Sequence, residues 1–197
     1  MTPVPELAAL RQRLVTHPPV APTEAAFAAV ASVLRDGTEG PELLFIKRAE
    51  RDGDPWSGHL AFPGGKHDPG DASLLETAVR ETREEVGLRL ATDMYATRLD
   101  DVEAQRTGFR VAQFVFTLHE PQTVVAASSE VAATLWMPVD RLARREGAGT
   151  YQFSRAGFSV DLPCLRFGDY VLWGMTYRMT MQLLEATSLG QGDDASG

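Results

Sequence analysis

The segment from residue 62 to residue 88 constrains the fold more than any other part of the sequence. It begins with Phe62 and a Pro-Gly-Gly turn at 63–65, which ends a strand and lets bare backbone approach its surroundings closely. It closes at Gly87, a residue suited to ending a helix. Between these stops, residues 72–86 have the periodicity of an amphipathic helix, with one apolar arc made of Leu75, Ala78, Val79, Thr82 and Val86.

Three acidic residues gather on another side of this predicted helix. Glu81, Glu84 and Glu85 fall within an arc of about 100°, so their carboxylates are neighbours that repel one another. They also occupy the last turn, where the helix dipole favours cations over anions. A bound hard cation such as Mg²⁺ or Mn²⁺ removes both conflicts, because carboxylate oxygens are its natural ligands. A solvated acidic helix face is the alternative interpretation.

The rest of the sequence predicts more strands than helices, in mixed order. Two apolar runs at 26–34 and 43–48 are separated by a Gly-containing and Pro-containing turn and predict a hairpin. The further predicted strands are 59–62, 95–99, 111–118, 134–137, 150–153, 158–162 and 170–172, and the further helices are 5–16, 139–145 and 175–185. This order favours an α+β fold layered as an α/β/α sandwich.

The length of 197 residues predicts one main domain. We expect an N-terminal helix and a Pro-rich linker at 1–22, the domain itself at 23–187, and a disordered polar tail at 188–197.

Charge and cysteine content exclude several classes of protein. The chain has 27 acidic and 19 basic residues, and its net charge of −8 disfavours nucleic acid polymers as partners. Cys164 is the single cysteine, so no intrachain disulfide is possible, and its apolar neighbours predict a buried, inert thiol. Neither a secretory signal nor an apolar run of about 18 residues is visible. We therefore expect a cytoplasmic protein that binds no membrane.

Residues 65–88 resemble the Nudix box. The family pattern is Gly, five residues, Glu, seven residues, then Arg-Glu-apolar-x-Glu-Glu-x-Gly-apolar. Here five residues separate Gly65 from Asp71, and eight more lead to Arg-Glu-Thr-Arg-Glu-Glu-Val-Gly-Leu at 80–88. Asp71 replaces the first Glu of the pattern, the spacer is one residue longer, and Thr82 replaces an apolar residue. The chain is thus identified as a member of a family of hydrolases that cleave nucleoside diphosphates linked to another moiety, with a mixed β-sheet between helices.

The departures resemble one branch of this family, the coenzyme A diphosphatases. Asp71 with the longer spacer, the run Trp-Gly-Met-Thr at 173–176, and Leu-Leu at 43–44 leading to Arg48 are similar to that branch. The upstream branch motif, Leu-Leu-Thr-x-Arg-Ser, is kept in part, since Phe45 stands at the Thr and Ala49 at the Ser.

The resemblance implies a metal site and a set of catalytic residues on the predicted helix. Glu81, Glu84 and Glu85 correspond to the acidic ligands of Mg²⁺ or Mn²⁺, and Glu84 and Glu85 are the foremost catalytic candidates. The carbonyl group of Gly65, or of Gly64 beside it, is expected to supply a further ligand.

Other residues are expected to complete the catalytic site. Arg80 resembles the arginine of the box that steers an acidic neighbour, and Asp71 would hold the box loop, with helix capping near Ser73 an equally good account. A metal ligand or base from a later loop is usual in the family. Glu130 is our candidate, and its rivals are Glu120 and Glu103.

Basic residues near the box are candidates for binding the substrate. These are Arg48, Arg51 and Lys66, whose cationic groups suit phosphate. Exposed loop cations are the alternative interpretation. The histidines and tryptophans nearby are expected to pack rather than to bind, except Trp56, which lies in a polar loop; the packing set is His59, His67, Trp136 and Trp173.

The expected reaction is metal-dependent hydrolysis of the diphosphate in coenzyme A or a related nucleoside diphosphate derivative. Two alternatives stay open at this point. One is a Nudix hydrolase of nucleotide sugars, ADP-ribose or nucleoside triphosphates, and the other is a catalytically silent Nudix protein that senses a ligand. The sequence is also compatible with a homodimer.

Overall fold

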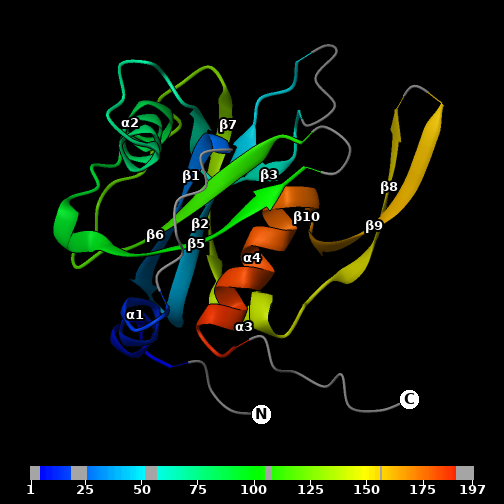
Figure 1. Cartoon of the computed structure of the whole chain (residues 1–197). Helices are drawn as coiled ribbons and strands as arrows, with labels where there is room; N and C mark the ends of the chain where they lie inside the picture. The colour runs from blue at the N-terminus through cyan, green and yellow to red at the C-terminus, as the bar shows by residue number, and fades with distance from the viewer. Residues whose placement is uncertain (1–4, 19–25, 52–56, 105–107, 156, 190–197) are drawn as a thin grey trace.

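In the part of the chain that the structure describes, residues 5–18, 26–51, 57–104, 108–155 and 157–189, seven strands form a mixed sheet (Figure 1). The structure is a computed structural model. Strands β1 (Ala26–Gly37) and β6 (Arg110–Thr117) run parallel at the centre, while the other pairs are antiparallel. The strand order is β3-β2-β1-β6-β5, with β4 paired to β1 and β7 paired to β2. The remaining bounds are β2 (Gly40–Arg48), β3 (Leu60–Ala61), β4 (Gly64–Lys66), β5 (Tyr95–Glu103) and β7 (Val131–Pro138).

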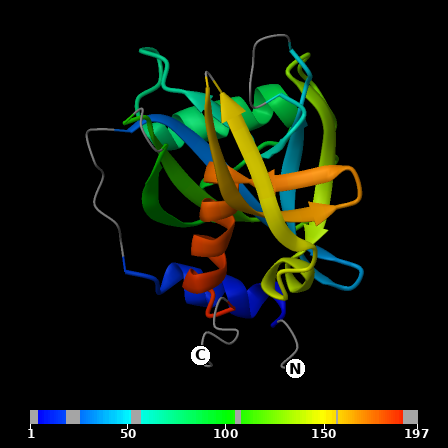
Figure 2. The same ribbon diagram turned by 90° about the vertical axis from the view of Figure 1, so that its right-hand side faces the viewer.

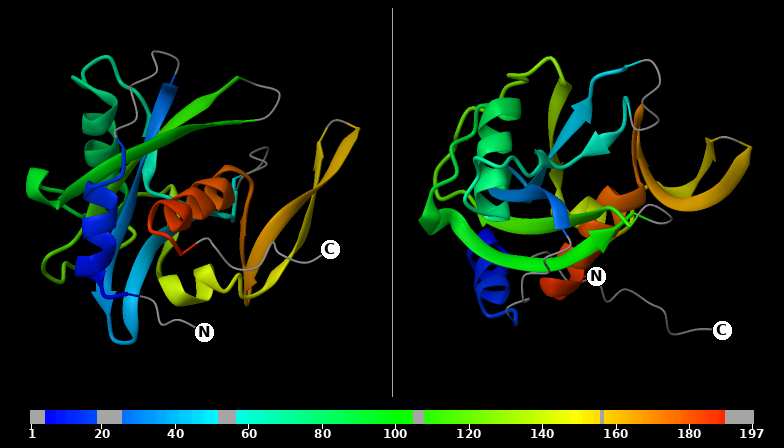
Figure 3. Two further views of the ribbon diagram at one scale, coloured as in Figure 1. Left: turned by 60° about the horizontal axis from the view of Figure 1, so that its bottom comes forward. Right: turned by 45° about the horizontal axis from the view of Figure 1, so that its top comes forward.

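Helices cover both faces of this sheet, as the sequence predicts. On one face, α2 (Leu74–Val86) packs through Ala78 and Val86 against alternate side chains of β1, including Ala29 and Val33. The other face is covered by α1 (Leu7–Val15), α3 (Val139–Ala143) and α4 (Gly174–Ala186), as the two views of Figure 3 show. A short 3-10 helix, η1 (Thr92–Met94), leads into β5. The expected α/β/α layering is therefore confirmed.

A second, three-stranded sheet lies beside α4 and was not predicted as a separate sheet. It has the order β10-β9-β8 and consists of β8 (Ala148–Arg155), β9 (Phe158–Phe167) and β10 (Tyr170–Trp173) (Figure 2). Along β8, Tyr151 and Phe153 are half-buried while Gln152 between them is exposed. This alternation explains why the sequence indicates strands here, and it identifies a ribbon with one face on the body of the protein.

The N-terminal helix belongs to the main core. Leu7, Leu10 and Leu14 are buried, and the Arg11 guanidinium donates to Thr117 Oγ1 at 2.5 Å and to the carbonyl of Asp93 at 2.7 Å. The predicted boundary between residues 22 and 23 lies outside the described residues.

The C-terminal helix ends slightly later than expected. Ser188 and Leu189, the first residues of the predicted tail, still donate their amides to carbonyls of α4, and Leu189 packs on the core. The rest of that tail, 190–197, is outside the described residues. Cys164 is buried, in agreement with the sequence. None of the helices in the described part of the chain is long and apolar enough to cross a membrane.

The packing of α1 generates a test of its place in the core. Leu10→Ala should lower the free energy of unfolding by about 2–5 kcal/mol, because it leaves a cavity at a side chain with no exposed surface. Val15→Ala, at a 56% exposed position of the same helix, should change it by less than about 0.5 kcal/mol. Denaturant titration measures both variants, and equal small effects would show that α1 is an appendage.

Candidate active site

Helix α2 begins and ends where its flanking residues dictate. Ser73 is extended and caps the helix, since its side chain accepts from the amide of Glu76 at 3.2 Å; the helix therefore begins at Leu74 rather than at residue 72. At the other end Gly87 takes φ = 71° and donates its amide to the carbonyl of Arg83 at 3.0 Å. These two helix boundaries place the acidic residues in the last two turns of α2, over β4.

The buried face of α2 differs from the predicted apolar arc. Ala78, Thr82 and Val86 are buried as expected, but Leu75 and Val79 are only half-buried. Thr77 and Glu85, by contrast, are buried, so the buried face of the helix includes polar side-chain atoms.

Glu85 is buried because its carboxylate binds the turn that precedes the helix. Oε2 of Glu85 accepts from the amide of Gly64 at 2.8 Å. Burial raises the pKa of Glu85 to about 7, against the opposing effects of the Gly64 hydrogen bond and the charge of Arg48. Gly64 has φ = +153°, and a Cβ there would lie 2.3 Å from the carbonyl oxygen of Ala29, so only glycine fits this position.

Arg80 contacts the more exposed part of the acidic cluster, which consists of Glu81, Glu84 and Glu85. Its Nε and Nη2 atoms donate to the two carboxylate oxygens of Asp71 at 2.8 and 2.9 Å, a bidentate pair. Its Nη1 atom donates to Glu81 at 3.0 Å and to Glu84 at 3.1 Å. Hydrogen bonding from Arg80 holds the pKa of Asp71 well below its usual range, while burial raises the pKa of Glu81. Arg80 thus lies between a carboxylate in the loop and two on the helix.

Asp71 takes part in a second set of contacts that the sequence analysis missed. Thr77 Oγ1 lies 2.8 Å from Asp71 Oδ2, and His67 Nδ1 lies 2.9 Å from the same Thr77 oxygen. A signal for Thr77 was available, since it precedes Arg80 and Glu81 by three and four residues and so shares their helix face. Asp71 does not cap the helix; Ser73 does.

The donor set suits a hard divalent cation. In the described residues no three His, Cys, Asp or Glu side chains enclose a metal position as they stand; here Arg80 holds Glu81 and Glu84, and Gly64 holds Glu85. A Cβ on Gly65 would lie 2.4 Å from Glu81 Oε1, so the glycine backbone borders this carboxylate directly. The half-buried Glu81, the buried Glu85 and the exposed Glu84 are therefore oxygen donors that could hold Mg²⁺ or Mn²⁺ beside a bare backbone.

Glu130 and the two predicted arginines lie beside this cluster. Arg51 pairs with Glu130 at 3.2 Å, and the carbonyl of Glu130 accepts from the amide of Ala49 at 2.8 Å. The charge of Glu130 adds to the rise in the pKa of both Glu81 and Glu85, and the charge of Arg48 opposes it at Glu85. The loop before β7 is thus fastened to the end of β2, within electrostatic range of the helix acids.

The two rivals of Glu130 have other surroundings. Glu103 pairs with Arg110 at 3.0 Å across β5 and β6, and Glu120 is an exposed residue that follows β6. The structure therefore brings only Glu130, of these three acids, to the cluster in the described part of the chain.

The remaining predicted residues are placed as follows. Lys66 is exposed at the end of β4, where its carbonyl accepts weakly from Arg80 at 3.5 Å.

His59 Nε2 lies 3.1 Å from the hydroxyl of Tyr151, and both rings pack on the buried Trp173. Trp136 is half-buried beneath the guanidinium of Arg35, at 4.0 Å. Trp56 lies outside the described residues.

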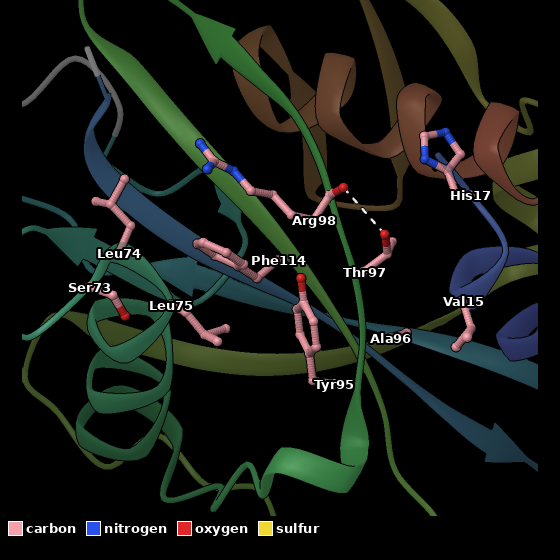
Figure 4. Close-up of a pocket in the computed structure, with 10 residues that line it drawn as sticks. All are labelled: Val15, His17, Ser73, Leu74, Leu75, Tyr95, Ala96, Thr97, Arg98 and Phe114. Carbon is pink, nitrogen blue, oxygen red and sulfur yellow. Dashed lines mark hydrogen bonds between the residues drawn. The ribbon is translucent and has the colours of Figure 1, made fainter. Parts of the chain in front are cut away.

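A cavity of about 620 Å³ lies elsewhere, between α1, β5 and the first turn of α2 (Figure 4). Its lining includes Leu74, Tyr95, Arg98 and Phe114, and none of the predicted site residues belongs to it. The acidic cluster occupies the opposite, C-terminal end of α2. The candidate active site around the acids is therefore separate from this cavity.

Known proteins resemble this chain over most of its length. A family model described as the NUDIX domain matches residues 26–156. The chain belongs to the Nudix hydrolase family. Among relatives of this Nudix protein, the human mitochondrial coenzyme A diphosphatase NUDT8 is 33% identical over 153 residues, which cover 76% of this chain and 64% of the human protein. The uncharacterized Nudix hydrolase NudL of Yersinia enterocolitica is 28% identical over 149 residues, covering 76% of this chain and 75% of that one.

Solved structures share the Nudix fold. A MutT/nudix family protein from Enterococcus faecalis matches with a TM-score of 0.58 and 14% identity, over 93% of this chain and 70% of that one. A NUDIX hydrolase from Alicyclobacillus acidocaldarius matches with a TM-score of 0.51 and 23% identity, over 64% of this chain and 84% of that one. At these identities the likeness concerns the fold.

The contact between Gly65 and Glu81 generates a second test. Gly65→Ala should weaken Mn²⁺ binding about tenfold or more, because the new Cβ displaces the Glu81 carboxylate from the site. The unfolding temperature should fall little, since the displaced group is the end of a flexible side chain. Titration followed by electron paramagnetic resonance measures the binding. The matched control is Gly149→Ala, whose Cβ would meet Cys164 Sγ at an ordinary 3.9 Å. Unchanged affinity in Gly65→Ala would contradict the metal assignment of this face.

Proposed function

We propose that this Nudix protein hydrolyses the diphosphate linkage of coenzyme A, or of a closely related nucleoside diphosphate derivative, with Mg²⁺ or Mn²⁺ as cofactor. The observation that carries the proposal is the gathering of Glu81, Glu85 and Glu130 within electrostatic range of one another, with Arg48 beside them. Such a set of oxygen donors next to a cation suits a polyanion that arrives with a divalent metal.

The reaction adds one water across a phosphorus–oxygen–phosphorus bridge. Coenzyme A and water then give 4′-phosphopantetheine and adenosine 3′,5′-bisphosphate. When bound, the metal would neutralise the diphosphate and lower the pKa of a coordinated water. Glu81, Glu84 and Glu85 would hold it, with the backbone of Gly65 alongside.

The protein's own side chains supply the remaining chemistry. Glu130 would accept the proton of the attacking water, because it is exposed, lies near the helix acids and comes from a separate loop. Arg48, Arg51 and Lys66 would bind phosphate oxygens. Arg51 is paired with Glu130 in this structure, so a phosphate that binds Arg51 also changes the surroundings of Glu130.

The choice of substrate follows from the relatives and the box. The human relative is named as a coenzyme A diphosphatase, and Asp71, the longer spacer and the Trp-Gly-Met-Thr run resemble the same branch. Because the match spans 64% of the human protein, its activity is a hypothesis for this chain. The cytoplasm remains our prediction for the compartment. If the protein hydrolysed ADP-ribose, a nucleotide sugar or a nucleoside triphosphate instead of coenzyme A, its assignment to the Nudix family would stand. Its assignment to the coenzyme A diphosphatase branch would then be wrong.

A substrate panel with acidic variants tests the proposal. Incubated with Mg²⁺ or Mn²⁺ in ¹⁸O-water, the protein should convert coenzyme A to the two products above, with the label on one of them by mass spectrometry. Glu84→Gln and Glu85→Gln should each lower kcat by roughly two orders of magnitude or more. They should change the stability of the metal-free protein little, because the exposed pair of Glu84 with Arg80 contributes little and a glutamine oxygen at position 85 can still accept from the Gly64 amide.

Glu76→Gln is the matched control for this experiment. Glu76 lies in the first turn of α2, where its carboxylate accepts from the amide of Ala72, and a glutamine oxygen accepts equally. Its turnover should equal that of the wild type. Wild-type turnover in both Glu84→Gln and Glu85→Gln would disprove the metal site, and absence of any hydrolysis would favour a ligand sensor.

The role of Glu130 has its own test. Glu130→Gln should lower kcat about 100-fold or more with little change in KM, since proton transfer matters in the transition state. Glu103→Gln is matched in setting, because Glu103 is 47% exposed and paired with an arginine, as Glu130 is at 55%. Steady-state kinetics should show wild-type values for Glu103→Gln. If Glu103→Gln lost activity and Glu130→Gln did not, Glu103 rather than Glu130 would be the base.

A further inference from the structure

A buried hydroxyl lies behind the ion pair of Asp71 and Arg80. The Thr77 side chain has no exposed surface, and its oxygen is 2.8 Å from Asp71 Oδ2 and 2.9 Å from His67 Nδ1. The carbonyl of Ser73 is a more distant neighbour at 3.3 Å. Together with the pair at 2.8 and 2.9 Å between Arg80 and Asp71, these contacts form a continuous relay from His67 to Arg80.

The direction of each hydrogen bond in the relay can be deduced. Asp71 is ionised beside Arg80, so its carboxylate only accepts. The single hydroxyl proton of Thr77 must therefore point at Asp71, because two oxygens 2.8 Å apart without a proton between them would repel. The lone pairs of Thr77 then accept, which requires a proton on Nδ1 of His67.

The relay compensates for an unusual carboxylate. Asp71 is one methylene shorter than the glutamate of the box pattern, and its amide closes a turn by donating to the carbonyl of Asp68 at 2.9 Å. Its Oδ2 atom accepts from the Thr77 hydroxyl at 2.8 Å, from Arg80 at 2.9 Å and more weakly from the amide of Asp68 at 3.2 Å, which leaves the carboxylate little freedom to rotate.

The orientation of Asp71 determines how Arg80 divides its donors. Two guanidinium nitrogens bind Asp71, and Nη1 alone reaches the helix acids Glu81 and Glu84. If Asp71 rotated away, all the donors of Arg80 would be available to those two carboxylates. Arg80 would then compete with a divalent cation for the same oxygens.

We propose that Thr77, oriented by His67, is a positioning residue for the acidic cluster. Its hydroxyl holds Asp71 in the one orientation that keeps Arg80 away from full engagement with Glu81 and Glu84, which leaves their oxygens accessible to metal. The inference rests on the proposed metal-dependent function.

Removing the hydroxyl without changing the shape of the side chain tests this role. In Thr77→Val the dissociation constant for Mn²⁺, measured by electron paramagnetic resonance, should rise about tenfold, and kcat should fall with it. Thr77→Ser keeps the hydroxyl and should stay within about twofold of the wild type. Thr82→Val is the matched control, because Thr82 is equally buried on the same helix but donates to the carbonyl of Ala78 at 2.7 Å. Wild-type affinity in Thr77→Val would overturn the proposal.

A spectroscopic measurement keeps the relay testable if Thr77→Val does not fold. At about pH 8.5, where ordinary imidazoles are neutral, ¹⁵N NMR of the wild type should show His67 as the Nδ1–H tautomer. The sequence has 4 histidines, so His67→Gln assigns the signal. An Nε2–H tautomer for His67 would overturn the relay. If Glu85→Gln binds Mn²⁺ as the wild type does, the proposed function fails instead, and the tautomer still decides the relay.

Discussion

Mutual repulsion among the carboxylates of α2 is the constraint on which the site depends. A helix that ends in several acids, with its dipole unfavourable to them, needs cationic or hydrogen-bonding groups close by. The protein supplies two such groups before any metal binds. The amide of Gly64 donates a hydrogen bond to the carboxylate of Glu85. The guanidinium of Arg80 donates hydrogen bonds both to Asp71 and to the more exposed acids of the helix. Both arrangements need the turn before the helix to stand very close to it.

The sheet provides this closeness. Strand β4 pairs with β1 in a register that places Gly64 opposite Val30 and Gly65 opposite Ala29. Small residues on β1 and bare glycines on β4 allow the strand, the turn and α2 to approach more closely than side chains would permit. The same sheet aligns the end of β2 with the loop before β7, which brings Arg51 to Glu130. The catalytic candidates thus come from distant segments because neighbouring strands end at one edge.

Much of this could be predicted from local patterns. The helix, its acids and its closing glycine follow from spacing alone, and so do most strands and the layering. The burial of Glu85 could not be predicted, because it depends on where the Gly64 amide points after the sheet has formed. The pair of Arg51 and Glu130 joins residues far apart in the sequence and exists only through strand pairing.

The relay shows a different limit of prediction. Thr77 lies on the acidic face by helix geometry, but His67 reaches it only through the particular course of the loop at 67–71. The second sheet was missed for a related reason. An alternating pattern at Tyr151 and Phe153 indicates a strand with one covered face, yet it does not say which neighbour covers that face.

The parallel pairing of β1 with β6 has a consequence for the order of folding during synthesis. Strand β1 can pair with β2 across a two-residue turn soon after both leave the ribosome, but its other edge waits for residue 110 and beyond. Loop closure over such a separation is slow, and until then a long apolar strand in the middle of the future sheet keeps an open edge. Between the synthesis of β2 and that of β6, the nascent chain therefore carries an unpaired strand edge, and the acidic helix that is made in this interval has no complete sheet to cover.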